Sequence, residues 1–374
     1  MKFPEFTEEW VNVSLKDVAD FQKERISSGL LDESTYISTE NILQNFQGVQ
    51  SAISIPANSN VIAYKKNDIL LSNIRPYLKK VWFSDRIGGC SADVFVLRSK
   101  TCEPEFLYNV IASDKFINYV MSGAKGVKMP RGDKNQMGSF SFSIPAVAEQ
   151  RKISRLFQLL DERIATQNKI IEKYESLIKG LNNILLYGTE GKYVCLGDIL
   201  LERSERSRTN NQHEVLSSTV KGIFSQREYF SKDIASENNV GYKIIRLHDV
   251  VLSPQNLWMG NINYNDRFDI GIVSPSYKVF SIADGYDNQF VAAMLKTYRA
   301  LYSYMMVSEQ GASIVRRNLN MEAFLQLVFK IPSLDKQREI GYAISLLKYQ
   351  LKTANKIIRA YISQKKYLLR QMFI

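Results

Sequence analysis

Two loops in the first half of the sequence combine polar side chains with several cations. Residues 72–80 carry Ser, Asn, Arg and Lys, and residues 123–134 carry four cations separated by glycines and a proline. Arg and Asn side chains can form paired hydrogen bonds with base edges, whereas Lys suits phosphates, and a glycine-rich backbone can approach a phosphate closely. These loops indicate nucleic-acid binding, and the candidate contacts are Ser72, Asn73, Arg75, Lys79, Lys80, Lys125, Lys128, Arg131 and Lys134.

A second pair of polar loops occurs in the other half of the sequence, at residues 253–263 and 311–320. Any one such loop is more often a solvated surface turn than a binding site. The recurrence of both loops in both halves favours the functional interpretation. The candidate contacts here are Ser253, Gln255, Asn256, Asn261, Asn263, Arg316, Arg317 and Asn318.

The motifs that would indicate catalysis are missing. The sequence has neither a GxxxxGK[ST] phosphate loop nor a GxGxxG turn, and no (D/N/S)PP(Y/F) string of an adenine methyltransferase. Three cysteines without CxxC spacing and two histidines do not predict a zinc site. We therefore expect a recognition module without catalytic or metal-binding residues.

The bulk composition is that of a basic, soluble protein. Its 374 residues exceed one comfortable core and favour two domains, and the net charge of +11 favours a polyanionic partner. No apolar run approaches the roughly 18 residues of a membrane span. Since the first residues lack an apolar signal core, we expect a cytoplasmic protein with reduced thiols and no membrane partner.

The most informative feature of the chain is an internal repeat. Residues 144–186 align with residues 331–373 without a gap, at an offset of 187, and 16 of the 43 positions are identical. Each copy opens with Ile-Pro followed by Gln-Arg at Gln150 and Gln337. Because proline suits the first turn of a helix, we expect a helix to begin just after each Ile-Pro pair.

Apolar residues recur in both copies at alternating steps of four and three, which is the a/d pattern of a coiled coil. Two core helices of an all-α protein are the alternative. We expect two long antiparallel helices whose seam also docks partner subunits. The seam residues are Ile153, Phe157, Leu160, Ile164, Ile171, Tyr174, Ile340, Ile344, Leu347, Leu351, Ile358 and Tyr361.

The C-terminal copy carries most of the basic excess. Residues 332–374 contain nine Lys or Arg and two Asp or Glu, whereas residues 145–187 contain seven and five. A solvated face, a track for phosphates and a site for an acidic protein all remain open. The exposed cations would be Lys352, Lys356, Arg359, Lys366 and Arg370.

The segments before the helices also match, more faintly, so the predicted order is domain, helix, domain, helix. The predicted fold is α+β: two similar mixed, β-rich domains with an internal pseudo-twofold repeat. The boundaries are 1–143 and 188–330 for the domains and 144–187 and 331–374 for the helices. Within the domains we expect strands at 52–56, 61–64, 69–71 and 94–97, and helices at 106–122 and 288–308.

The doubled Ile-Pro-(x)4-Gln-Arg-x-Ile opening and the domain-helix order resemble the specificity subunits of type I restriction-modification systems. The segment from Phe3 to Trp10, followed by Leu15 and Asp17, adds to the resemblance. In the second copy Lys336 stands where the family often has an acidic residue.

The resemblance implies a non-catalytic subunit that recognises a bipartite double-stranded DNA site through two target-recognition domains, with the helices as spacers. It further implies two methyltransferase subunits and two restriction/translocase subunits as partners. S-adenosylmethionine, ATP and Mg would then be bound by those partners, and this chain would bind no cofactor.

Two other functions remain open from the sequence alone. The first is a coiled-coil scaffold without DNA binding, and the second is a detached recognition module of a larger methyltransferase. The DNA target, its spacer length and the base-reading residues do not follow from the sequence, because base choice depends on loop conformation.

Overall fold

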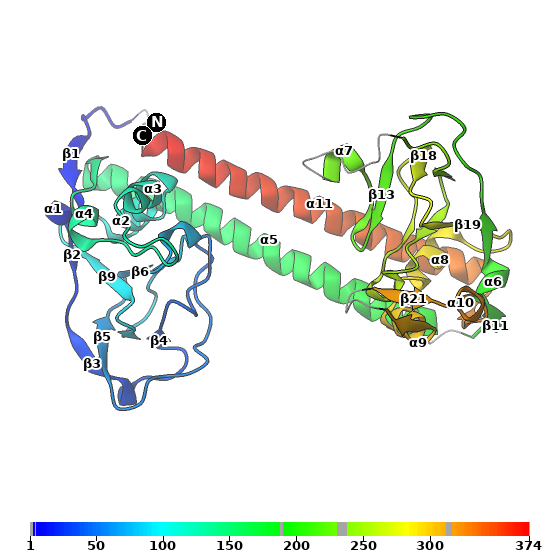
Figure 1. Cartoon of the computed structure of the whole chain (residues 1–374). Helices are drawn as coiled ribbons and strands as arrows, with labels where there is room; N and C mark the ends of the chain where they lie inside the picture. Colours follow the sequence, from blue (N-terminus) through cyan, green and yellow to red (C-terminus); the bar gives the residue numbers. More distant parts are fainter. Residues whose placement is uncertain (1–2, 4, 188–189, 230–237, 312–315, 374) are drawn as a thin grey trace. The chain divides into compact units, whose positions relative to one another are not determined.

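The computed structural model describes residues 3, 5–187, 190–229, 238–311 and 316–373. It divides into two compact units, which we treat separately: unit 1 comprises residues 1–168 and 356–374, and unit 2 comprises residues 169–355. Each unit is mixed and β-rich. Two long helices, α5 (Val147–Tyr187) and α11 (Leu334–Met372), contribute one segment each to both units. The predicted α+β class with a repeated domain and two long helices is confirmed (Figure 1).

Unit 1 is built on a four-stranded antiparallel sheet in the order β2-β9-β6-β7, beside a second sheet in the order β3-β5-β8-β4 and the pair β1-β10. Its elements are β1 (Val11–Ser14), α1 (Leu15–Val18), β2 (Ala19–Phe21), β3 (Arg25–Ser27), η1 (Ser28–Leu30), β4 (Tyr36–Ile37), β5 (Asn60–Tyr64), β6 (Ile69–Ser72), η2 (Pro76–Leu78), β7 (Val81–Phe83), β8 (Gly88–Cys90), β9 (Val94–Ser99), α2 (Pro104–Ile111), α3 (Asp114–Ser122), α4 (Lys134–Gly138) and β10 (Ser141–Ile144).

Unit 2 repeats this order with the sheet β12-β19-β16-β17 and the pair β11-β22. Its elements are β11 (Lys192–Cys195), α6 (Leu196–Ile199), β12 (Leu200–Arg203), β13 (Leu216–Thr219), β14 (Gly222–Ser225), α7 (Gln226–Tyr229), β15 (Lys243–Arg246), β16 (Val250–Leu252), η3 (Leu257–Met259), β17 (Ile262–Tyr264), β18 (Ile270–Val273), β19 (Lys278–Ile282), α8 (Asn288–Met294), α9 (Tyr298–Met306), β20 (Ser308–Gln310), β21 (Arg317–Leu319), α10 (Met321–Leu325) and β22 (Val328–Ile331).

One inner strand of the sheet β2-β9-β6-β7 and of its counterpart β12-β19-β16-β17 is buried on both faces. In β6, Ile69 and Leu71 pack in the core that contains α2 and α3, whereas Leu70 packs in a separate core on the other side of the sheet. Successive side chains of a strand point to opposite faces, so a continuous apolar run is needed here. In β16, Val251 is likewise separated from the core that holds its neighbours Val250 and Leu252.

The prediction of single helices at 106–122 and 288–308 is wrong. The structure has two short helices in each place, α2 and α3 in the first and α8 and α9 in the second. Ser113 separates α2 from α3, and its hydroxyl accepts a hydrogen bond from the Phe116 N–H at 3.2 Å. Thr297 separates α8 from α9 and accepts from the Ala300 N–H at 3.2 Å. A side-chain cap of this kind begins a new helix and permits the chain to turn before it.

The strand predicted at 52–56 is also absent from the structure. Pro56 has no N–H to donate to a ladder, and Ile53 is 89% exposed, so neither residue supports a strand with a buried face. The other three predicted strands correspond to β5, β6 and β9, with boundaries shifted by up to two residues.

Within unit 1, the segments of α5 and α11 run antiparallel. The rings of Phe157 and Phe373 stack with centroids 6.4 Å apart, and Lys365 forms an ion pair with Asp161 at 2.6 Å. Later residues of α5 therefore lie beside earlier residues of α11, as antiparallel helices require. Phe157 and Phe373 also belong to the core of the sheet and α2, so the ends of both helices are part of the globular body.

A buried glutamine joins each long helix to its domain. Gln150, in the first turn of α5, donates to the Pro145 carbonyl at 2.7 Å and accepts from the Glu103 N–H at 2.9 Å. Gln337 of α11 repeats both contacts, with the Pro332 carbonyl at 2.9 Å and the Asp287 N–H at 3.0 Å. Both side chains are 2% exposed. The repeated Gln therefore fixes the start of each long helix against the start of the helix that follows the sheet.

We expect the substitution Gln150→Ala to lower the free energy of unfolding by about 2 kcal/mol, because it leaves a buried carbonyl and a backbone N–H without their partner. Gln337→Ala should cost a similar amount. Urea unfolding followed by circular dichroism measures both. Gln158→Ala, on the exposed side of α5, is the matched control and should change stability little. Equal stability of all three variants would show that the glutamines do not carry the junction.

Candidate nucleic-acid interface

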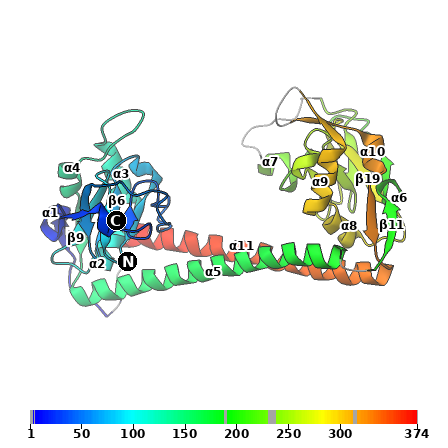
Figure 2. The same cartoon turned by 90° about the horizontal axis from the view of Figure 1, so that it is seen from below.

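The two polar loops of unit 1 meet in space. The Arg75 N–H donates to the Pro130 carbonyl at 2.8 Å, and the Gly132 N–H donates to the Asn73 carbonyl at 3.1 Å. The loop between α3 and α4 stands out from the body of the unit (Figure 2). Residues 72–80 and 123–134 therefore form one surface, which we call the unit 1 loop pair.

Arg75 and Lys128 are the exposed cations of this loop pair that make no ion pair, side-chain hydrogen bond or cation–π contact in the described part of the chain. Arg75 has a φ of 51°, in the left-handed region, and precedes the short helix η2. A left-handed conformation is uncommon for a residue other than glycine and is held here by the backbone contact to Pro130. Lys128 follows Gly126, whose φ of 97° makes the turn at the loop tip.

The other predicted cations of the unit 1 loop pair have partners inside the unit. Lys80 donates to the Thr39 carbonyl, and Ser72 is 1% exposed. Lys80 and Ser72 therefore support the loops from inside the unit and do not project from them. The remaining contacts are Arg131 with Asp93 at 2.7 Å, Lys125 with Asp133 at 3.4 Å, Lys79 with Asp114 at 2.5 Å, and Lys134 over the Phe95 ring at 4.7 Å.

The two loops of unit 2 also meet, since the Arg317 N–H donates to the Gln255 carbonyl at 3.1 Å. Gln255, Arg316 and Asn318 are exposed. The Arg317 side chain instead turns inward and donates to the Ser308 hydroxyl at 2.9 Å. Residues 312–315 of the predicted second loop lie outside the described residues.

The predicted seam residues of α5 and α11 all lie on partly or fully buried faces. Ile153, Phe157, Leu160, Ile340, Ile344 and Ile358 are buried. Ile164, Ile171, Tyr174, Leu347, Leu351 and Tyr361 are partly buried.

Residues 7–176 match the family model described as "Type I restriction modification DNA specificity domain". The chain is 23% identical over 187 residues to the type I restriction enzyme EcoDI specificity subunit of Escherichia coli, an alignment covering 49% of this chain and 41% of that protein. It is 25% identical over 248 residues to the MjaVIII specificity subunit of Methanocaldococcus jannaschii, covering 65% of this chain and 56% of the relative. Residues 7–176 are therefore a type I restriction-modification DNA specificity domain, and the chain is similar to specificity subunits over 49% and 65% of its length.

A solved structure of a type I restriction-modification S subunit from M. genitalium has the same fold. It superimposes with a TM-score of 0.63 at 14% identity, covering 100% of this chain and 98% of that one. The chain spans about half the length of the two curated relatives it matches. Among the described residues, no helix is long and apolar enough to cross a membrane, and no cluster of His, Cys, Asp and Glu is placed to hold a metal ion.

Two of the predicted base-reading residues of unit 2 need correction. Asn261 and Asn263 are each 4% exposed, so they are not available at the surface. The Asn263 amide donates to the Ser218 hydroxyl and to the Thr219 carbonyl, both at 2.7 Å. The sequence pattern does not reveal this burial, because Asn alternating with apolar residues is also typical of a polar loop. The predicted contact Ser253 is also buried, at 9% exposure.

Lys296 extends this buried network behind the loops of unit 2. Its ammonium donates to Asn263 Oδ1 at 2.6 Å and to the Val220 carbonyl at 3.3 Å. Burial, together with a smaller effect of the charge of Lys348, lowers the pKa of Lys296 to about 8. No sequence motif singled out Lys296, since its partner lies 33 residues away in the chain.

Each unit also contains one loop asparagine whose carbonyl oxygen lacks a partner. Oδ1 of Asn73 and Oδ1 of Asn256 are buried without a hydrogen bond in the described part of the chain. A buried acceptor without a donor costs about 1–3 kcal/mol. That cost favours any rearrangement of the loops that supplies a donor.

Because Lys296 is protonated less readily when folded, the unfolded chain binds more protons between pH 8 and the ordinary lysine pKa of 10.5. The free energy of unfolding attributable to Lys296 therefore rises with pH through this window. We expect the melting temperature of wild type to rise relative to that of Lys296→Met as the pH increases from 7.5 to 10. Thermal unfolding by circular dichroism measures it, with exposed Lys221→Met as the control. A difference independent of pH would mean that Lys296 titrates normally.

Proposed function

We propose that this chain recognises a bipartite double-stranded DNA site and directs the modification and restriction subunits of a type I system to it. Each unit reads one short block of base pairs through its loop pair. The chain itself carries no catalytic step. The observation that carries the proposal is that both units bring two polar loops together at the same place in one repeated fold.

The chemistry of the unit 1 loop pair supports direct readout. Arg75 is exposed, free to reorient and held at its backbone by Pro130 and η2, so its guanidinium can reach the O6 and N7 atoms of a guanine. Lys128 at the loop tip suits a phosphate. In unit 2, exposed Gln255 and Arg316 are the corresponding candidates for a base edge and for a phosphate or base.

The long helices support docking of two copies of one partner. Leu159 of α5 and Leu346 of α11 occupy the same position of the repeat and are 40% and 45% exposed. Ile170 and Ile357, at another shared position, are 39% and 38% exposed. On each helix the leucine and the isoleucine are 11 residues apart, about three turns, and so share a face. Two equivalent apolar faces on two helices fit two identical subunits.

The chemistry of modification and cleavage belongs, in this proposal, to those partners. Two methyltransferase subunits would bring S-adenosylmethionine, and two restriction/translocase subunits would bring ATP and Mg. The chain would supply the sequence choice and the docking faces.

Arg75→Ala should relax the preference for one base pair of one block and cost about 1–3 kcal/mol for that base pair, because the paired hydrogen bonds to guanine are lost. Titration of the purified complex against targets changed one base at a time measures this. Arg25→Ala, an exposed arginine of β3 whose guanidinium donates to the Asn60 carbonyl, is the control. If Arg75→Ala leaves every base preference intact, the loop pair does not read bases through this residue.

Lys128→Ala should weaken binding to all duplexes alike and reduce the slope of log affinity against log salt by about one, because one phosphate contact releases about one counterion. Binding isotherms at several salt concentrations, with specific and random duplexes, measure both quantities. An unchanged salt slope would place Lys128 outside the interface.

Leu159→Asp combined with Ile170→Asp should reduce the number of bound methyltransferase subunits from two to one per chain, since the α5 face is charged and the α11 face is intact. Native mass spectrometry of the co-purified complex counts them. Ser176→Asp, also exposed on α5, should retain both subunits. Retention of two subunits by the double variant would show that these faces do not dock them.

A further inference from the structure

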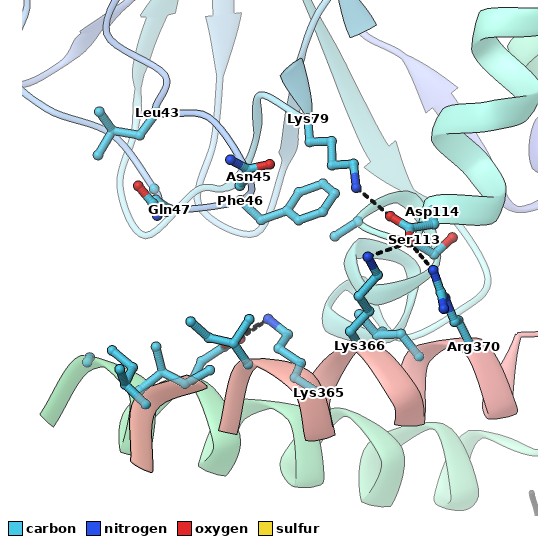
Figure 3. Close-up of a pocket in the computed structure, with 18 of the residues that line it drawn as sticks. Leu43, Asn45, Phe46, Gln47, Lys79, Ser113, Asp114, Lys365, Lys366 and Arg370 are labelled. Atoms are coloured by element: carbon cyan, nitrogen blue, oxygen red, sulfur yellow. Dashed lines mark hydrogen bonds and ion pairs between the residues drawn. The ribbon is translucent and has the colours of Figure 1, made fainter. Parts of the chain in front are cut away.

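Unit 1 contains a cavity of about 1080 Å³ that shares only Lys79 with the loop pair and none of the four exposed leucine and isoleucine residues of the proposed docking faces. It lies between residues 43–48, the start of α3, and the segments of α5 and α11 that belong to this unit (Figure 3). Its size is at the upper end of the range for small-molecule sites. A small molecule could therefore be held largely within it.

One wall of the cavity is apolar. Ile164, Ile358 and Ile362 line it from the helices, and Ile362 is 50% exposed although it faces the cavity. Phe46 lines the opposite, loop side (Figure 3). Its φ of 61° is left-handed, which is unfavourable for an aromatic residue. The backbone holds it there, since the Phe46 N–H donates to the Lys79 carbonyl at 3.0 Å.

The other wall is cationic. Lys79, Arg370 and Lys366 approach the Asp114 carboxylate at 2.5, 3.3 and 3.6 Å (Figure 3). The hydrogen bond from Lys79 is the main cause that keeps the pKa of Asp114 below its usual value, with further lowering by Lys366, so Asp114 is ionised at neutral pH. One carboxylate balances one of the three cations and leaves two positive charges at this wall.

The wider lining has the same excess. Lys115 and the pair formed by Lys365 and Asp161 complete its charged residues, so the cavity carries five cations and two carboxylates, a net charge of +3 (5 − 2). Lys366 and Arg370 are 54% and 62% exposed, and a guanidinium or an ammonium has several donors, so each can bind a further acceptor.

We propose that this cavity binds an amphipathic organic anion, with the anionic group beside Lys366 and Arg370 and the apolar body between Phe46 and Ile362. This site goes beyond DNA recognition. A DNA backbone presents phosphates without apolar groups and would leave the isoleucine wall unused. Because Lys79 belongs to the unit 1 loop pair and Arg370 to α11, a bound anion would connect the two.

The test uses the full-length chain and two fluorescent probes of nearly the same shape. 8-Anilinonaphthalene-1-sulfonate carries the anion, and N-phenyl-1-naphthylamine lacks it. Lys366→Ala and Arg370→Ala should each weaken binding of the sulfonate probe by about tenfold, as expected for the loss of one charge-assisted hydrogen bond, and leave the neutral probe unchanged. Asp114→Asn should tighten binding of the sulfonate probe, because it frees the cations.

Lys356→Ala, on the exposed surface of α11 and outside the cavity lining, is the matched control. It should bind both probes like wild type. Since Lys366 and Arg370 are largely exposed, their removal leaves the fold intact, and circular dichroism confirms this. Equal affinity of all variants for the sulfonate probe, or equal weakening of both probes, overturns the proposal.

Discussion

The interaction on which the rest of the structure depends is the pair of hydrogen bonds made by one buried glutamine in each unit. Gln150 and Gln337 each join the first turn of a long helix to the first turn of the helix that follows the sheet. Because both partners are backbone groups, the junction does not depend on the side chains around it. Each unit can therefore change its exposed loops while the helix keeps its place on the domain.

The loop pairs show the same separation between backbone contacts that hold the structure and exposed side chains that can change. In both units, backbone hydrogen bonds bring the two loops together, at Arg75 with Pro130 and at Gln255 with Arg317. Many polar side chains near the loops, including Arg131 and Asn263, bind other residues of their own unit and so stabilise the loops. Among the side chains left exposed are Arg75, Lys128 and Gln255, whose chemistry suits bases and phosphates. A recognition surface that is changed through a handful of exposed residues follows from this arrangement.

The sequence predicted the architecture well, because the repeat and the heptad pattern are properties of residue spacing. It predicted the two loop regions of each unit but not which of their residues are exposed. Asn261 and Asn263 illustrate the limit: their burial depends on Ser218, which is more than forty residues away in the chain. The division of the 106–122 helix depends on a single cap at Ser113, which propensity over the whole segment does not reveal. The Asp114 cluster joins residues from three distant segments and has no local signature.

The most direct measurement of the central claim is a selection from a pool of random duplexes with the chain in complex with the proposed methyltransferase subunits. Two units that each read one block predict enrichment of two short defined sequences separated by a gap of fixed length with no base preference. Exchange of Gln255 and Arg316 for alanine should then alter one of the two blocks and leave the other and the gap unchanged. Enrichment of one continuous sequence, or of none, would contradict the account.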